Sequence, residues 1–485
     1  MKINNYRSVK INAILNSIKQ CCSILFPLIT FPYVSRVLGD DGFGKYSFAM
    51  SIVNYLILFA GLGINTYAVR EGARIRDDRT EINKLASELF SINVVFSILA
   101  YIILWLLFTF SEKINSYKEY ILILSVSIVL ICIGMEWVNN IFEDFFYITC
   151  RYIFIQVVAL CLMFACIKSK QDVAKYCIIA IFATYGGNLI NVFYVRRYVG
   201  LKFTFHMNFK KHIVPLVVLF VNQLAITIYV NSDITMLGYY YPDSIVGQYS
   251  LASKVYTIIK QLINAAVVVT LPRISYLLSH DKKKFEPYLS KIISGVMGLI
   301  FPIVTGLFLL ARPILLITGG SDYIGAMGSL QILSFAVIFS IFGTIMSYGV
   351  LISCGHEKEC LISTAITATV NVGLNFVLLP ILGIEGAALT TIIAEAMNLF
   401  IQLAMSKKII RIRFPFKIAF QYIIACIPIG LICIFCEKYI TNIVLEVLIA
   451  ILLSVFLYAI LLILFKNEFI ISFIDIAKKR LPKRR

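Results

Sequence analysis

Two lysines stand inside long apolar stretches of the chain, where a charge is costly. Lys254 lies roughly 10 Å inside its stretch at a helical rise of about 1.5 Å per residue, and Lys19 lies similarly deep in another. A charge in hydrocarbon costs about 2.5 to 3.5 kcal/mol on insertion scales, so such side chains normally face protein or a water-filled cavity. We interpret both lysines as cavity-facing cations. The alternative is that they snorkel to the interface or pair internally, as Lys19 would with Asp233.

Polar side chains recur at helical spacing on the same stretches. Ser51 and Asn54 fall within a narrow arc of one predicted helix, and Lys254 lies on a similar arc of another. Asn222 stands in the second half of the chain where Lys19 stands in the first. We expect these faces to line a polar cavity that binds substrate. The candidate binding residues are Asn16, Lys19, Ser51, Asn54, Asn222, Lys254, Thr257, Lys260, Gln261 and Asn264.

Two acidic residues in apolar stretches are candidates for binding a coupling ion. Asp233 and Glu395 could each hold a proton or a sodium ion, and a structural hydrogen-bonding role is the alternative. Glu395 continues with Asn398 and Gln402 along one helical face. Lys260 is a weaker cavity candidate than Lys254, because it lies about 80° off the polar arc of its predicted helix. Apart from such a coupling cation, we predict no cofactor and no metal.

The composition places these residues in a membrane protein. Of the 485 residues, 60% are hydrophobic and 14% are charged, and the mean hydropathy is +0.88. Because a bilayer core of about 30 Å takes about 20 apolar residues per helix, the chain can cross it many times, which excludes a cytosolic enzyme. We predict an all-α polytopic membrane protein with about 14 transmembrane helices. They are expected over residues 11–38, 42–69, 82–110, 117–142, 144–167, 172–195, 213–241, 245–271, 289–311, 324–353, 360–382, 385–405, 416–436 and 440–465.

A short repeated motif divides these helices into two sets. The pattern GxYSxA begins at Gly44 and again at Gly247, 203 residues later, and the same offset pairs Ser51 with Lys254. Six predicted helices separate the copies, so both halves should have the same orientation, as in parallel six-helix repeats. We therefore expect an N-terminal lobe, an amphipathic cytoplasmic linker, a C-terminal lobe, two further helices and a basic tail. Their ranges are 1–200, 201–212, 213–407, 408–466 and 467–485.

The basic residues predict the orientation in the membrane. Most of the 44 lysines and arginines fall in alternate connections and at both ends of the chain, so both termini are expected in the cytoplasm. We therefore explain the net charge of +18 by basic residues at the cytoplasmic surface of the membrane, and we predict no nucleic-acid partner. All four histidines fall in connections predicted to be cytoplasmic, which argues against a histidine relay or zinc site within the membrane. They are His206, His212, His280 and His356.

Several enzyme classes lack the sequence features that they require. No predicted connection exceeds about 20 residues, which leaves no room for a soluble catalytic domain. There is no GxxxxGK[ST] motif for nucleotide phosphates. Cys433 and Cys436 form a CxxC pair inside an apolar run, and we interpret them as packing residues rather than as a redox or zinc site.

Two sequence runs carry a resemblance to a known family. FPYVSRVLGDDGFGKYSFA at 31–49 and GLGINTYAVREGAR at 61–74 resemble the opening of the Wzx-type flippases of bacterial polysaccharide biosynthesis, and VGQYSLASK at 246–254 is similar to their second half. Arg36 and Arg70 match basic positions of that family at helix ends, where anchoring at the interface is as good an explanation as substrate contact.

The resemblance implies the fold of the multidrug and oligosaccharidyl-lipid exporter superfamily, with two six-helix lobes around a central cavity. It implies a bacterial cytoplasmic membrane protein that moves an undecaprenyl-diphosphate-linked oligosaccharide from the inner to the outer leaflet by alternating access. The product would serve capsule, O-antigen, teichoic acid or a related polymer, with a polymerase and export machinery as further partners. Cavity lysines would replace part of the hydration of the diphosphate.

Two other functions remain open from the sequence. A cation-coupled exporter of small molecules could use the same fold, but its cavity should be dominated by acidic and aromatic residues rather than by lysines. A membrane-integral polymerase or ligase for lipid-linked sugars needs catalytic groups on the outer side, typically with a sizeable outer loop. The predicted outer connections are about ten residues or fewer, with scattered acids only.

Overall fold

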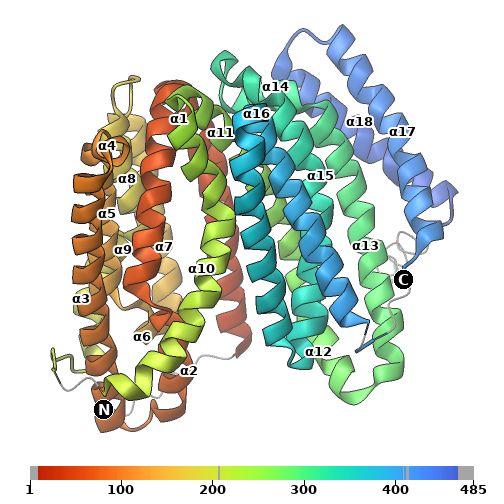
Figure 1. Ribbon diagram of the computed structural model, residues 1–485. Helices are drawn as coiled ribbons and strands as arrows, with labels where there is room; N and C mark the ends of the chain where they lie inside the picture. The colour runs from red at the N-terminus through yellow and green to blue at the C-terminus, as the bar shows by residue number, and fades with distance from the viewer. Residues whose placement is uncertain (1–8, 206–207, 408, 411–413, 468–485) are drawn as a thin grey trace, which may run out of the picture. The chain divides into compact units, whose positions relative to one another are not determined.

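Helices make up all the regular structure in the described part of the chain. The computed structural model describes residues 9–205, 208–407, 409–410 and 414–467, and no strand occurs among them (Figure 1). The predicted all-α class is therefore confirmed. The predicted basic tail, apart from Asn467, and His206 lie outside the described residues.

The chain forms two compact units, Met1–Gly247 and Gln248–Arg485. The helices of the first unit, red to yellow-green in Figure 1, are α1 (Val9–Gly61), α2 (Ile64–Ile75), α3 (Arg79–Phe110), α4 (Glu112–Asn115), α5 (Lys118–Gly134), α6 (Glu136–Ile141), α7 (Phe145–Cys166), α8 (Val173–Tyr185), α9 (Gly187–Tyr194), η1 (Val195–Arg197) and α10 (Phe209–Tyr240).

One helix, α11 (Asp243–Val268), begins in the first unit and continues into the second. The remaining elements, green to blue in Figure 1, belong to the second unit. They are α12 (Leu271–His280), α13 (Lys282–Leu309), α14 (Ala311–Thr318), η2 (Ser321–Ala326), α15 (Met327–Thr344), η3 (Ile345–Leu351), η4 (Ile352–Cys354), α16 (Glu357–Ser406), α17 (Phe416–Tyr439) and α18 (Ile443–Leu464).

Two of the longest helices are each interrupted by one glycine. Gly39 in α1 has φ 69° and Gly383 in α16 has φ 60°, a backbone region that glycine enters without steric cost. Both breaks fall between stretches that the sequence predicts as separate helices. Each of these elements therefore comprises two helices that meet at a sharp bend.

Ten helical segments are long and apolar enough to cross a membrane, by length and composition. The number rises to eleven if α11 and the first part of α12, which are bent by 41°, count as one span. This count takes α1, together with α2, as one segment and α16 as another, although both contain a glycine break. The multi-pass architecture is confirmed, and the number of fourteen stays a prediction.

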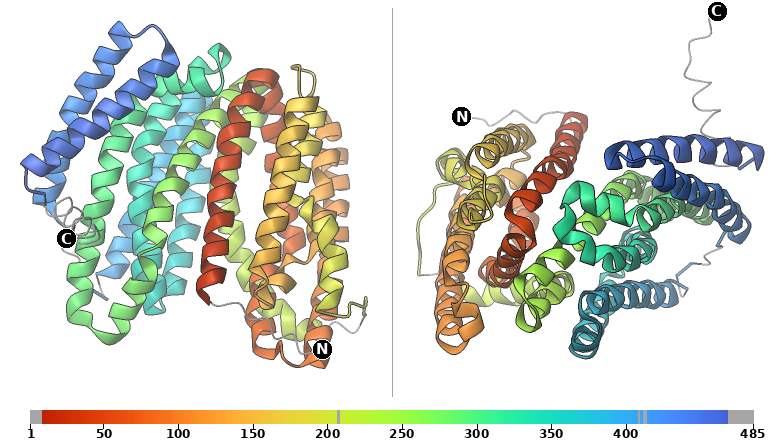
Figure 2. Two further views of the ribbon diagram at one scale, coloured as in Figure 1. Left: turned by 180° about the vertical axis from the view of Figure 1, so that it is seen from behind. Right: turned by 90° about the horizontal axis from the view of Figure 1, so that it is seen from above.

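Within the first unit, α1 is the central helix, since it packs against α3, α5, α7 and α10. Within the second, α15 packs against α13 and α16, and α17 and α18 form a hairpin beside α13 (Figures 1 and 2). Helix α10 packs on α1, so it belongs to the first compact unit, which ends at Gly247.

The predicted lobes 1–200 and 213–407 were defined by the sequence repeat and not by compactness. Their boundaries therefore stay a prediction.

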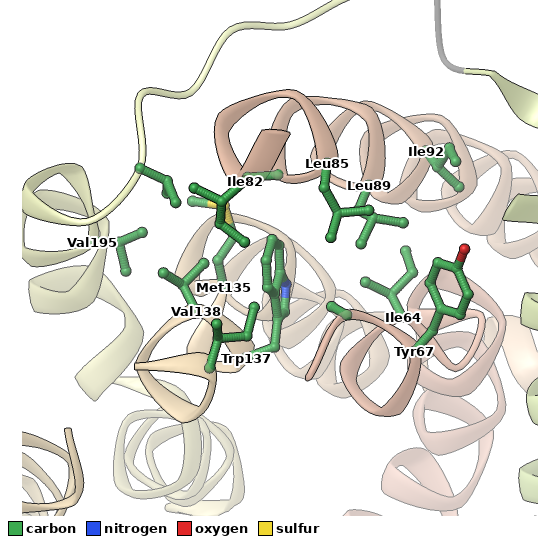
Figure 3. Packing of buried hydrophobic residues seen from close by; sticks show 14 of the residues in the cluster. Ile64, Tyr67, Ile82, Leu85, Leu89, Ile92, Met135, Trp137, Val138 and Val195 are labelled. Atoms are coloured by element: carbon green, nitrogen blue, oxygen red, sulfur yellow. The ribbon is translucent and has the colours of Figure 1, made fainter. Parts of the chain in front are cut away.

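A buried hydrophobic cluster joins α2, α3 and α6 at one end of the first unit. Figure 3 shows the Trp137 ring among side chains that include Ile64 and Leu85, and all three are at least 95% buried. Met135, with a positive φ of 42°, ends α5 and directly precedes α6. The packing of Trp137 thereby fixes the direction of the short helix α6, whose first residue is Glu136.

The first glycines of the two GxYSxA copies, Gly44 and Gly247, lie against each other. A Cβ atom on Gly44 would overlap the carbonyl oxygen of Asp243, and a Cβ atom on Gly247 would overlap that of Asp40. Asp40 and Asp243 are separated by the same 203 residues as the glycines, so the contact is reciprocal. The motif glycines therefore allow two backbones to approach closely, in addition to marking a repeat.

We expect Gly44→Ala and Gly247→Ala each to lower the free energy of unfolding by about 1 to 3 kcal/mol, because the added methyl group must displace backbone. The measurement is the midpoint of unfolding by SDS in mixed micelles. Gly373→Ala is the matched control, since a Cβ there meets nothing within 4 Å in the middle of α16. Equal midpoints for all three variants and the unmodified protein would show that this contact is not close-packed.

Candidate functional site

Three charged side chains from separate helices meet in the first unit. The Lys19 Nζ atom of α1 lies 3.0 Å from Glu136 Oε1 of α6. The Arg151 Nη2 atom of α7 lies 3.7 Å from the other carboxylate oxygen, Oε2. One carboxylate thus bridges two cations, and this cluster of Lys19, Glu136 and Arg151, which we call the Glu136 cluster, carries a formal charge of +1.

The guanidinium of this cluster is buried and incompletely satisfied. The Arg151 side chain is 7% exposed and the Lys19 side chain is 31% exposed. Among the described residues, the Arg151 Nη1 atom is buried without a hydrogen-bond partner, and the guanidinium lies 5.2 Å from the centre of the Tyr147 ring. A buried donor left unpaired costs about 1 to 3 kcal/mol. The cluster therefore has the charge and the free donor to bind an anionic group.

The predicted partner of Lys19 is replaced by another acid. The sequence offered Asp233 as the partner if Lys19 pairs internally, whereas the structure pairs Lys19 with Glu136. Asp233 is 5% exposed within α10. Sequence reasoning missed Arg151 because it counted this residue among the basic residues of the cytoplasmic side, although it falls within the predicted helix 144–167. The structure places it one and a half turns inside α7.

A second ion pair lies in the second unit, between α11 and α16. The Lys260 Nζ atom is 2.8 Å from Glu395 Oε1, and the Tyr256 hydroxyl donates to the same oxygen over 2.9 Å. Glu395 is 4% exposed. The lysine that the sequence ranked lower is thus the one in an ion pair. Lys254 has an exposed side chain and no ion-pair partner among the described residues.

The polar arc of α1 bonds to α10. Ser51 Oγ accepts a hydrogen bond from Thr235 over 2.9 Å, and Asn54 Nδ2 donates to Asn231 Oδ1 over 3.1 Å. A hydroxyl or amide in these positions holds two apolar helices together, because an unpaired polar group there would be costly. Whether these residues also contact a substrate stays a prediction.

The other predicted binding residues make no side-chain hydrogen bond to another helix among the described residues. Asn16 and Gln261 are exposed, Asn222 is half-buried, and Thr257 donates to the Ser253 carbonyl in its own helix. The Asn264 Oδ1 atom is buried without a partner in the part of the chain that the structure describes.

The two basic residues that match family positions are both exposed. Arg70 lies 3.0 Å from Glu71, its neighbour in sequence, and its side chain is 53% exposed. Arg36 is also exposed. These placements fit interfacial anchoring as well as they fit substrate contact.

His212 contradicts the prediction that every histidine lies in a connection. It belongs to α10, is 0% exposed, and lies 2.8 Å from both Glu88 and Tyr67. The predicted helix began one residue later, at Ile213. Glu88, which is 4% exposed, also went unnoticed. The sequence held one signal for each residue. His212 directly precedes an apolar stretch, and Glu88 stands among the apolar residues of α3.

An apolar cavity of about 540 Å³ lies in the second unit. Its lining is shared among α13, α17 and α18 and includes Pro302, Leu307, Ile429 and Val455. Since almost all of the lining is hydrocarbon, the cavity suits an alkyl or isoprenoid chain rather than a sugar.

Comparison with known sequences gives a consistent group of relatives. A family model described as polysaccharide biosynthesis protein matches residues 9–278. A putative O-antigen transporter of Escherichia coli (strain K12) is 23% identical over 398 residues, covering 81% of this chain and 95% of the relative. A probable low-salt glycan biosynthesis flippase, Agl15, of Haloferax volcanii is 27% identical over 187 residues, covering 38% of this chain and 39% of the relative.

Comparison with solved structures supports the fold. The lipid II flippase MurJ in an inward closed conformation aligns with a TM-score of 0.75 at 18% identity, covering 95% of this chain and 99% of that one. An inward-facing multidrug resistance transporter of the MATE family aligns with a TM-score of 0.61 at 14% identity, covering 82% and 97%. The chain therefore has a helical fold similar to those of these two transporters, as the resemblance predicted, and the central cavity stays a prediction.

We expect Lys260→Met to lower the free energy of unfolding by roughly 3 kcal/mol, because it leaves Glu395 buried without its counter-charge. The double variant Lys260→Met with Glu395→Gln should regain most of that loss. The measurement is again SDS-induced unfolding. As a control, Lys284→Met removes an ion pair whose lysine is 77% exposed, and it should change little. A double variant that is no more stable than Lys260→Met would contradict the pairing.

Proposed function

Since the chain belongs to the polysaccharide biosynthesis protein family, we propose that it is a flippase that moves a lipid-linked oligosaccharide across the membrane. It is a multi-pass membrane transporter rather than an enzyme. The relatives named as an O-antigen transporter and a glycan flippase support a lipid-linked sugar as the substrate.

The observation that carries this proposal is the Glu136 cluster. An undecaprenyl-diphosphate headgroup is anionic, and its charge must pass through a region where hydration is lost. Lys19 and Arg151 can replace part of that hydration with charge-assisted hydrogen bonds, and the free Nη1 donor of Arg151 offers one of them. In this proposal the diphosphate competes with Glu136 for the two cations.

The second unit supplies two further elements of the proposal. Lys254, an exposed cation without an ion-pair partner in the described chain, is the candidate contact of this unit for an anionic group. The apolar cavity between α13 and α18 is a place for part of the isoprenoid tail, since its lining is hydrocarbon. The sugar would meet the neutral polar residues, such as Asn16 and Asn222.

The remaining features of the proposal concern direction and energy. We propose transport from the inner to the outer leaflet of a bacterial cytoplasmic membrane by alternating access, with both termini in the cytoplasm. Asp233 and Glu395 are the proposed sites for a coupling proton or sodium ion, and Glu395 would have to exchange Lys260 for that ion. A polymerase and export machinery are the proposed partners.

The test is translocation of a fluorescent undecaprenyl-diphosphate-linked oligosaccharide in proteoliposomes. Lys19→Ala and Arg151→Gln should each slow transport at least about tenfold, since a hydrogen bond to a charged group is worth about 1.5 to 3 kcal/mol. Lys254→Ala should also slow it. Lys438→Ala, which removes an exposed cation at the end of α17, is the control and should leave the rate unchanged.

Two results would contradict the proposal. If the intact protein moves no such lipid but exports small cations under an ion gradient, it is a drug exporter on the same fold. If the lipid moves but none of the three cation variants slows it, the headgroup binds elsewhere. Circular dichroism and size-exclusion chromatography of each variant separate loss of transport from loss of folding.

A further inference from the structure

A chain of hydrogen-bonding groups connects three helices at one end of the first unit. His212 of α10 lies between Glu88 of α3 and Tyr67 of α2. Its Nε2 atom is 2.8 Å from Glu88 Oε2, and its Nδ1 atom is 2.8 Å from the Tyr67 hydroxyl. Asn208, immediately before α10, donates to the other oxygen of Glu88 over 3.1 Å. These contacts hold the start of α10 against α2 and α3.

Three members of this hydrogen-bonded group are buried, while Asn208 at its end is exposed. His212 is 0% exposed, and Glu88 and Tyr67 are each 4% exposed. Tyr67 belongs to the hydrophobic cluster that surrounds Trp137, and Figure 3 shows its hydroxyl at the edge of that cluster. Leu89 and Leu216, the neighbours of these polar residues in α3 and α10, belong to the same cluster. An uncompensated charge in such surroundings is costly.

The hydrogen bonds among these three groups are compatible with two protonation states. In one state a neutral imidazole donates from Nε2 to the Glu88 carboxylate and accepts the Tyr67 hydroxyl proton at Nδ1. In the other, an added proton occupies Nδ1, which donates to the Tyr67 oxygen, and that hydroxyl turns its own proton away. Proton uptake changes the net charge of the buried group from −1 to zero. The protonated state therefore pairs an imidazolium with a carboxylate instead of leaving a carboxylate alone.

Charged residues stand on each helix of this hydrogen-bonded group. On α3, the exposed Lys84 precedes Glu88 by four residues. On the α2 side, Glu71 and Arg70 lie beyond Tyr67, and Arg70 lies 5.7 Å from its ring centre. On α10 itself, Lys210 and Lys211 are exposed. Among the described residues, Glu88 is the acid in direct contact with the imidazole, so the proton on His212 depends chiefly on it.

A proline separates the first turns of α10 from the rest of the helix. Pro215 lies three residues after His212 inside α10, and a proline in a helix removes one backbone hydrogen bond and permits a bend. Beyond it, α10 carries Asn231 and Thr235, which bond to α1. Pro215 thus lies between His212 and the part of α10 that is bonded to α1.

We propose that Tyr67, Glu88 and His212 form a proton-binding site that controls how firmly the first turns of α10 are held to α2 and α3. The ligand is a single proton, and the site is distinct from the substrate-binding and ion-coupling residues proposed above. With the proton bound, the buried ion pair holds the helix start. Without it, the uncompensated carboxylate weakens the contact, so the start of α10 loosens as pH rises.

Hydrogen exchange measured by mass spectrometry in lipid nanodiscs tests this without reference to transport. Peptides covering 209–219 should exchange at least about fivefold faster at pH 8.5 than at pH 6 after correction for the intrinsic rate. In His212→Gln, whose amide keeps hydrogen-bonding capacity but does not titrate, this dependence on pH should disappear. Tyr67→Phe, which removes one hydroxyl only, should reduce it and serves if His212→Gln fails to fold.

Another histidine of the protein provides a matched control. His356 lies 2.7 Å from Glu359, but this pair is on the surface, with side chains 42% and 35% exposed. His356→Gln should leave the pH dependence at 209–219 as it is in the unmodified protein. The proposal is overturned if the unmodified protein shows equal corrected exchange at both pH values, or if His212→Gln retains the full difference. Both results are independent of whether the protein moves a lipid-linked sugar.

Discussion

The cost of an unpaired charge in an apolar environment organises this protein. Each unit carries a lysine within its helices that meets a carboxylate from another helix, Lys19 with Glu136 and Lys260 with Glu395. Water cannot satisfy such groups in hydrocarbon, so the helices must bring the partners together. These pairs therefore join α1 to α6 and α11 to α16. Pairs of this kind give specificity of packing more than they give net stability.

A second constraint is met by glycine, which allows helices to bend sharply and backbones to approach closely. Gly39 and Gly383 allow successive helices to meet at an angle, and Gly44 and Gly247 allow two backbones to touch. The reciprocal contact shows why the GxYSxA motif occurs twice. Where two backbones approach this closely, a small residue is needed on both sides. The motif thus carries a packing constraint, and its neighbours carry the polar chemistry.

The helices could be predicted from the sequence and most partners could not. Apolar length predicted the helices, because this feature is local. Which carboxylate faces Lys19 depends on α6, a helix of six residues directed by the packing of Trp137, and no periodicity reports that. His212 was misplaced for a related reason. Its burial comes from α2 and α3, which lie far away in sequence.

A flippase must release what it binds, and the Glu136 cluster suggests how a strongly cationic site can do so. Two cations with no counter-charge would bind a diphosphate tightly and would be costly to leave empty in hydrocarbon. With Glu136 between them, the empty site is already partly neutralised, and headgroup and carboxylate compete for the same donors. Only the difference between the two sets of hydrogen bonds then appears as affinity. A carboxylate inside an anion site therefore favours turnover over tight binding.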